Sequence, residues 1–88
     1  MQTKHTAETI TQEIANGIAR LALDGDGRYS HGAVGEVHGD INDMESETGG
    51  RRIIRAANDS EVAVYVREDG SLVIVADANG PVAIMEVA

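Results

Sequence analysis

Near the start of the chain, apolar residues recur with the period of an α-helix and leave polar residues on the other side. This pattern predicts an amphipathic helix over residues 6–23, with one apolar stripe facing a core. The stripe consists of Ile10, Ile14, Ile18 and Leu21, flanked by Ala15, Ala19 and Ala22.

The ends of this helix have recognisable signals. Thr6 is a candidate N-cap, and Thr9 followed by Gln12 offers a capping box that starts one turn later. Gly25 supplies a stop. Gly17 costs about 1 kcal/mol relative to Ala in the middle of a helix. Its presence therefore predicts a close approach of the helix to a sheet.

The last third of the chain predicts three antiparallel strands. Asp69-Gly70 and Asn79-Gly80 are typical two-residue hairpin turns. Two such turns place Val66 opposite Val73 and Val64 opposite Val75 in the first hairpin, and Val75 opposite Ile84 and Val73 opposite Glu86 in the second. One face then carries Val62, Val64, Val66, Val73, Val75, Val82 and Ile84. The other carries Ala63, Tyr65, Leu72, Ile74, Ala76, Ala83, Met85 and Val87.

Both faces of this predicted sheet are apolar, and one helix can cover only one of them. Residues 28–57, a second copy of the chain or a partner must cover the other. The strand over 82–87 carries one charge, Glu86, and lacks the usual protection of an edge strand. We therefore expect a homodimer, formed through the 82–87 edge or through one sheet face. The interface residues predicted for that face are Tyr65, Ile74, Met85 and Val87.

The middle of the chain has weaker signals. Residues 33–38 predict a strand interrupted by glycine, and residues 40–48 an acidic loop. Gly49-Gly50 predicts a turn, followed by a strand rather than a short helix over 51–57. The expected architecture is a single α+β domain over residues 1–88. In it, one N-terminal helix packs on an antiparallel sheet of four or five strands that ends in a β-meander.

Composition narrows the functional classes. The 88 residues include no cysteine, and the aromatic residues are two tyrosines. There is no disulfide framework, no thiol nucleophile, no signal-like N-terminus and no apolar run of membrane-spanning length. We expect a protein of the reducing cytoplasm, with no cofactor and no membrane contact.

The negative charge is concentrated in one segment. Residues 24–50 contain seven acids and one base, which gives −6 of the net −8. Such a field repels nucleic acid and anionic membranes and attracts basic surfaces. Adaptation to high salt would produce a similar composition, and in that case the acidity would not indicate a basic partner. The seven acids are Asp24, Asp26, Glu36, Asp40, Asp43, Glu45 and Glu47.

Candidate catalytic and metal motifs are incomplete. Residues 24–28 begin like a calcium loop, but the third and last ligand positions are Arg28 and Gly35. His31, His38 and Asp40 match no familiar zinc spacing, and we expect neither calcium nor zinc to bind. A serine next to His31 lacks the nucleophile-elbow pattern. The sequence therefore predicts a protein that is not an enzyme.

One basic cluster, Arg51, Arg52 and Arg55, follows the acidic residues. Without interleaved aromatic residues, and in a strongly negative chain, it does not predict nucleic-acid binding. We expect these arginines to pair with Asp43, Glu45 and Glu47 across the Gly49-Gly50 turn.

In size, acidity, absence of cysteine and absence of a catalytic motif, the chain resembles the small phage inhibitors of host defence. Examples are anti-CRISPR and anti-restriction proteins that mimic DNA. These proteins share no common motif, so the resemblance assigns no residues. It implies an inhibitor whose carboxylates occupy a basic nucleic-acid-binding groove of a partner protein. The charge pattern points to Asp40, Asp43, Glu45 and Glu47, with Asp24, Asp26 and Glu36 as a second set.

Two alternatives remain at this stage. One is a small homodimeric accessory or assembly module that uses its open sheet edge and whose acidity serves only solubility. The other is an acidic metal-dependent enzyme built on His31, His38 and Asp40.

Overall fold

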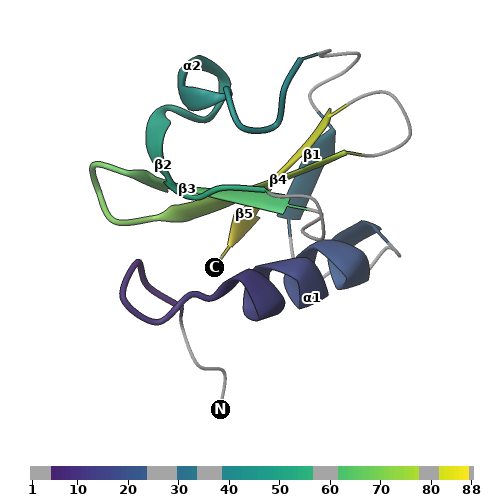
Figure 1. Cartoon of the computed structure of the whole chain (residues 1–88), viewed down its shortest axis with the longest axis horizontal. Helices are drawn as coiled ribbons and strands as arrows, with labels where there is room; N and C mark the ends of the chain where they lie inside the picture. The colour runs from purple at the N-terminus through teal and green to yellow at the C-terminus, as the bar shows by residue number, and fades with distance from the viewer. Residues whose placement is uncertain (1–4, 24–29, 34–38, 57–61, 78–81, 88) are drawn as a thin grey trace.

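A five-stranded antiparallel sheet with helical segments on its two sides forms the fold (Figure 1). The computed structural model describes residues 5–23, 30–33, 39–56, 62–77 and 82–87. The strand order is β1-β5-β4-β3-β2, so β2 to β5 form a meander and β1 adds to the outer side of β5. The predicted α+β class is confirmed. The elements are α1 (Gln12–Leu23), β1 (Ser30–Ala33), α2 (Glu45–Thr48), β2 (Gly50–Ile54), β3 (Val62–Arg67), β4 (Leu72–Asp77) and β5 (Val82–Val87).

The helix α1 begins later than the sequence predicts. Thr6 closes a separate turn, in which the Ile10 N–H donates to the Thr6 carbonyl at 2.9 Å. Thr11 then caps α1, because its Oγ1 accepts the Ile14 N–H at 3.2 Å. Gln12 ties the first turn of α1 to the sheet by donating from Nε2 to the Val62 carbonyl at 3.0 Å. The predicted stop at Gly25 lies outside the described residues.

Two expectations for the faces of α1 are wrong. A Cβ placed on Gly17 would meet no atom of the described residues within 4 Å, so the glycine does not mark a close approach to the sheet. Leu21 is 41% exposed and does not belong to the buried stripe. The rest of the stripe that the structure describes is confirmed, because the other predicted residues are buried or half-buried against the sheet: Ile10, Ile14, Ala15, Ile18 and Ala19.

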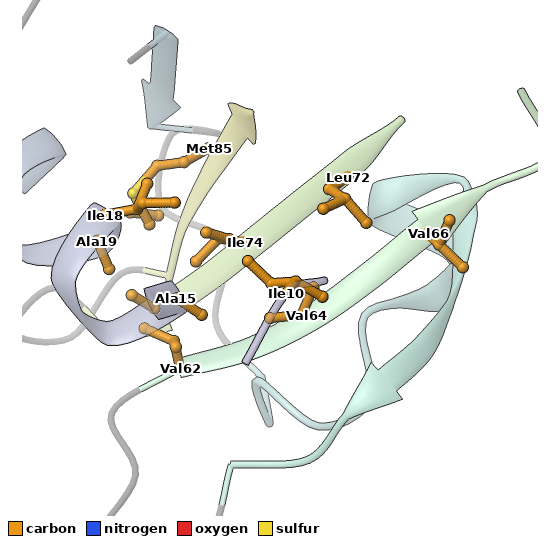
Figure 2. Packing of buried hydrophobic residues seen from close by; sticks show 12 residues of the cluster. Ile10, Ala15, Ile18, Ala19, Val62, Val64, Val66, Leu72, Ile74 and Met85 are labelled. Carbon is orange, nitrogen blue, oxygen red and sulfur yellow. The ribbon is translucent and has the colours of Figure 1, made fainter. Parts of the chain in front are cut away.

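The side of the sheet under α1 holds the larger hydrophobic cluster. Figure 2 shows α1 and Ile10 directing apolar side chains at the strands. Most of the strand residues in this cluster are small or β-branched, and such side chains fit a pleated surface. The sheet residues of this cluster are Val62, Val64, Val66, Leu72, Ile74, Ala76, Ala83 and Met85.

The opposite side of the sheet is covered by the chain itself. Met44 and the half-buried Ile41 pack there, in the segment that precedes β2, and Ala56 packs there just after β2. The sequence left three candidates to cover this face: residues 28–57, a second copy of the chain or a partner. The structure shows residues from the 28–57 segment in this position. The sheet residues on this side are Ala63, Tyr65, Val73, Val75, Val82 and Ile84.

The first hairpin has a different register from the predicted one. Its loop contains three residues, because the Arg67 N–H bonds the Ser71 carbonyl and the Gly70 N–H bonds the Arg67 carbonyl, both at 2.9 Å. Gly70 has φ 89°, the left-handed conformation that such a loop requires. Val66 therefore pairs with Leu72 rather than Val73. This slip by one residue turns every β3 side chain to the opposite face.

The Asp69 carboxylate stabilises this loop. It accepts hydrogen bonds from the Ser71 hydroxyl at 2.6 Å and from the Ser71 N–H at 2.9 Å. These bonds favour the ionised form and lower the pKa of Asp69. In the second hairpin the predicted register is confirmed, with Val75 opposite Ile84 and Val73 opposite Glu86.

The corrected register overturns the shared face predicted for the dimer. Tyr65 lies on the side covered by Met44, whereas Ile74 and Met85 lie under α1. All three side chains are 0% exposed within the single chain. Val87 pairs with Leu72 through the backbone, and its side chain lies outside the described residues.

The 82–87 edge predicted for the dimer is also wrong. β5 is an internal strand, because β1 pairs with it in the register that places His31 opposite Met85. The described sheet ends instead at β1 and β2. β2 carries a bulge between Arg52 and Ile54, a feature that discourages edge-to-edge pairing. That two copies of the chain associate stays a prediction, but neither the shared face nor the 82–87 edge can form the interface as first assigned.

Candidate functional site

Four of the seven predicted partner-binding acids lie on one continuous stretch, residues 39–48, which we call the acidic segment. Asp40, Asp43, Glu45 and Glu47 are all exposed. The segment crosses the side of the sheet opposite α1 (Figure 1) and includes α2. The second predicted set, Asp24, Asp26 and Glu36, lies outside the described residues.

The acidic segment begins with a turn stabilised by one of its own acids. The Asp40 Oδ1 accepts the Asn42 N–H at 2.8 Å, and the Asp40 carbonyl accepts the Asp43 N–H at 2.8 Å. Such an Asx turn fixes the backbone by local hydrogen bonds. The carboxylate of Asp40 thus combines an exposed charge with a structural bond.

The predicted loop at 40–48 contains one helical turn, α2. Gly49 ends it in the left-handed conformation, with φ 74°, and donates its N–H to the Glu45 carbonyl at 2.9 Å. The two glutamates of α2 lie in its first turn. Negative side chains are stabilised there by the unpaired N–H groups of the helix start.

Tyr65 of β3 attaches the acidic segment to the sheet. Its hydroxyl donates to the Ile41 carbonyl at 2.6 Å and accepts the Met44 N–H at 3.0 Å. The ring is fully buried, and burial raises the pKa of the phenol. The nearby carboxylates of Glu45 and Asp43 act in the same direction. The two backbone groups that Tyr65 binds bracket Asp43.

Asn42 makes a second attachment, to the chain just after β2. Its Nδ2 donates to the Ala56 carbonyl at 3.0 Å, and its Oδ1 accepts the Ala56 N–H at 2.8 Å. This side chain satisfies both backbone groups of Ala56, as a neighbouring strand would. Arg52 adds a bond from its Nη1 to the Asn42 carbonyl. The segment is therefore fixed from its inner side by neutral groups and one arginine.

The far end of the segment is fixed by buried side chains. Met44 and Thr48 are each 2% exposed. The Thr48 hydroxyl donates to the Met44 carbonyl at 2.8 Å, and Arg67 donates from Nε to the Thr48 carbonyl at 2.8 Å. Arg67 also bonds Glu86 at 3.0 Å, in an ion pair between β3 and β5. The backbone of α2 is thus tied to the sheet on the side away from its acids.

The ion pairs predicted between the two charged groups are wrong. Among the described residues, Arg51, Arg52 and Arg55 make no ion pair with Asp43, Glu45 or Glu47, and the ion pair found is Arg67–Glu86. Arg52 bonds a carbonyl of the acidic segment instead. The four carboxylates are therefore exposed without an arginine partner among the described residues.

Other candidate chemistry finds little support. The residues that resemble a calcium loop, 24–28, lie outside the described part, as does His38. His31 belongs to β1, and Asp40 is engaged in its own turn. Within the described ranges, no three His, Cys, Asp or Glu side chains gather as a metal site would require.

The surface also has a hollow of about 420 Å³ where β2 and β3 meet. It is lined by Gly49, Gly50, Arg51, Val66, Arg67 and Glu68.

Comparisons with protein-family models, with curated proteins and with solved structures found no match. Within the described residues, none of the helices has the length and apolar character needed to cross a membrane.

Sequence reasoning identified the charged residues of the site but not those that hold them. A signal for Tyr65 existed, because a tyrosine within an apolar strand requires a hydrogen-bond partner for its hydroxyl. The contribution of Asn42 had no signal, since its partner Ala56 lies 14 residues away.

Proposed function

We propose that this protein is a non-enzymatic acidic inhibitor that docks on a basic, nucleic-acid-binding surface of a partner protein in the cytoplasm. In this it would act as phage anti-CRISPR and anti-restriction proteins of the DNA-mimic type do. One observation about the acidic segment carries the proposal. Its backbone is bonded to Tyr65 of β3 and its Asn42 side chain to Ala56 just after β2, while its four carboxylates are exposed.

The attachment of the segment favours binding for a physical reason. A mobile loop that becomes ordered on binding loses backbone freedom, at about 1–2 kcal/mol for each residue that is fixed. A segment already bonded to the sheet avoids this cost. The backbone that carries the four carboxylates then presents them in a set order along the surface, as a nucleic-acid backbone presents its phosphates.

Charge supports the same proposal at longer range. With a net charge of −8, the chain itself is repelled by nucleic acid and is steered towards basic surfaces. The exposed Arg52, which bonds the Asn42 carbonyl, adds one positive charge beside the segment. Such a charge helps to orient the complex, because like charges on the partner must avoid it.

The test compares two variants that lose the same charge. In the first, Asp40 and Asp43 become Asn, and Glu45 and Glu47 become Gln. The Asp40→Asn change keeps the oxygen that accepts the Asn42 N–H. In the control, the exposed acids Glu8, Glu13, Glu68 and Asp69 are changed in the same way.

The readout is DNA binding by CRISPR effector complexes and restriction endonucleases, measured with and without each variant. We expect the wild type and the control to compete with DNA for one of these partners and the first variant to lose competition. Equal inhibition by both variants would show that the acidic segment is only a solvated surface.

The accessory-module alternative loses the surfaces assigned to it. The 82–87 edge is paired with β1, and the apolar faces are covered by α1 and by the acidic segment. The described sheet has edges at β1 and β2, but β2 carries a bulge that discourages pairing, so the exposed carboxylates favour the inhibitor.

A further inference from the structure

A single side chain outside the acidic segment bonds two backbone groups within it. The Tyr65 hydroxyl binds the Ile41 carbonyl at 2.6 Å and the Met44 N–H at 3.0 Å. The Tyr65 ring is 0% exposed and packs among apolar side chains of β3, β4 and β5. The hydroxyl is thus held at a fixed height above the sheet, and the segment is held with it.

We infer that Tyr65 is the positioning residue of the partner-binding surface, and that its hydroxyl sets the placement of Asp43 and of the first turn of α2. This inference rests on the proposed function only where it concerns binding. Where it concerns the placement of the segment, it rests on the two hydrogen bonds alone.

The physical argument concerns two backbone groups that Tyr65→Phe would leave without a partner. The Met44 N–H is buried, and an unpaired buried donor is strongly disfavoured. The ring of phenylalanine retains the packing of Tyr65 within the sheet. The response that costs the least free energy is therefore a local opening, in which residues 41–44 move away from the sheet and water reaches the unpaired groups. The strands β3, β4 and β5 remain paired.

Charged neighbours of both signs lie near the Tyr65 hydroxyl. Glu45 and Asp43 lie near the hydroxyl on the segment side, and Arg52 of β2 lies near it from the edge of the sheet. Because Arg52 also bonds the Asn42 carbonyl, it limits the opening at one end. The opening should therefore be largest at Asp43 and Met44.

Amide hydrogen exchange separates this role from a purely structural one. In Tyr65→Phe we expect the amides of Asp43 and Met44 to exchange at least about tenfold faster, with a smaller change at the amides of β4. The control is Val64→Ala, which removes buried atoms on the α1 side of the same strand. It should accelerate exchange in the sheet without a preferential increase at Asp43 and Met44. A uniform acceleration in Tyr65→Phe, or none at Met44, would overturn the inference.

A binding measurement uses a probe of known shape, an alanine-based helical peptide with arginine at every fourth position. At low salt we expect Tyr65→Phe to bind this peptide several-fold more weakly than the wild type, with no change in charge. Glu45→Gln with Glu47→Gln should weaken binding, and the matched pair Glu8→Gln with Glu13→Gln should leave it nearly unchanged.

The outcomes distinguish the two ideas. If the Glu45 and Glu47 changes have no more effect than the matched pair, the binding role of the acidic segment fails, and the exchange experiment still decides the placement by Tyr65. If those changes weaken binding but Tyr65→Phe does not, the positioning role fails and the proposed function survives.

Discussion

Met44→Ala tests whether the acidic segment is an integral part of the fold. Met44 is 2% exposed and belongs to the cluster that contains Tyr65, Val73 and Ile84. Truncating a buried methionine to alanine removes its transfer free energy and leaves a cavity, at about 2–5 kcal/mol. Met44 lies in the acidic segment, and this single segment can move towards the sheet and partly fill the cavity. We therefore expect about 3 kcal/mol, or roughly a hundredfold in the folding equilibrium constant.

This loss would be large for a chain of this size, whose total stability is about 4–13 kcal/mol at typical values per residue. Denaturant unfolding should show a lower midpoint with an unchanged slope. Met85→Ala is the matched control, because Met85 is 0% exposed on the α1 side. The two variants should lose similar free energy. A loss below about 1 kcal/mol for Met44→Ala alone would refute the packing of the acidic segment on the sheet.

The remaining predictions concern glycine positions and pH. Gly17→Ala should raise the unfolding free energy by about 0.5–1 kcal/mol, measured by thermal unfolding, because the position is helical and the described residues leave space for a methyl group. Gly50→Ala should lower it by about 2 kcal/mol, because the new Cβ would lie 2.6 Å from the Val66 carbonyl oxygen; an unchanged midpoint would contradict the tight β2–β3 pairing. Because the pKa of Tyr65 is raised in the folded chain, the unfolded chain loses its phenolic proton at a lower pH. The stability that the buried phenol contributes should therefore be complete below pH 10.0 and should decline as the pH rises towards the folded pKa. Unfolding measured from pH 9 to 11 in the wild type and in Tyr65→Phe checks this, and parallel curves would count against it.

The elements of the fold could be predicted because their signals are local. The spacing of Ile14 and Ile18 indicated the helix, and apolar runs separated by hairpin-turn signals indicated the strands of the sheet. The register of the first hairpin could not be predicted, because Asp69-Gly70 serves in both two-residue and three-residue loops. The choice depends on the bond between Arg67 and Ser71, which is a property of the folded hairpin.

The site was predictable only in its charges. Exposed acids follow directly from a polar segment, so Asp43 and Glu45 could be identified from the sequence. The docking of the segment depends on Met44 and on a bond to Tyr65, which lies 21 residues away. A lone methionine between acids has no periodicity, so the pattern did not show which side of the sheet would receive it.

The central claim is that the four carboxylates of the acidic segment bind a basic surface, and the salt dependence of the association rate tests it most directly. The rate would be measured by stopped flow with the partner that the wild type inhibits, from about 0.1 M to 1 M salt, where the screening length falls from about 10 Å to about 3 Å. We predict a steep fall of the wild-type rate, with a slower and much less salt-dependent rate for the variant with Asn at 40 and 43 and Gln at 45 and 47. A wild-type rate that does not respond to salt, or the same salt dependence in that variant, would contradict the claim.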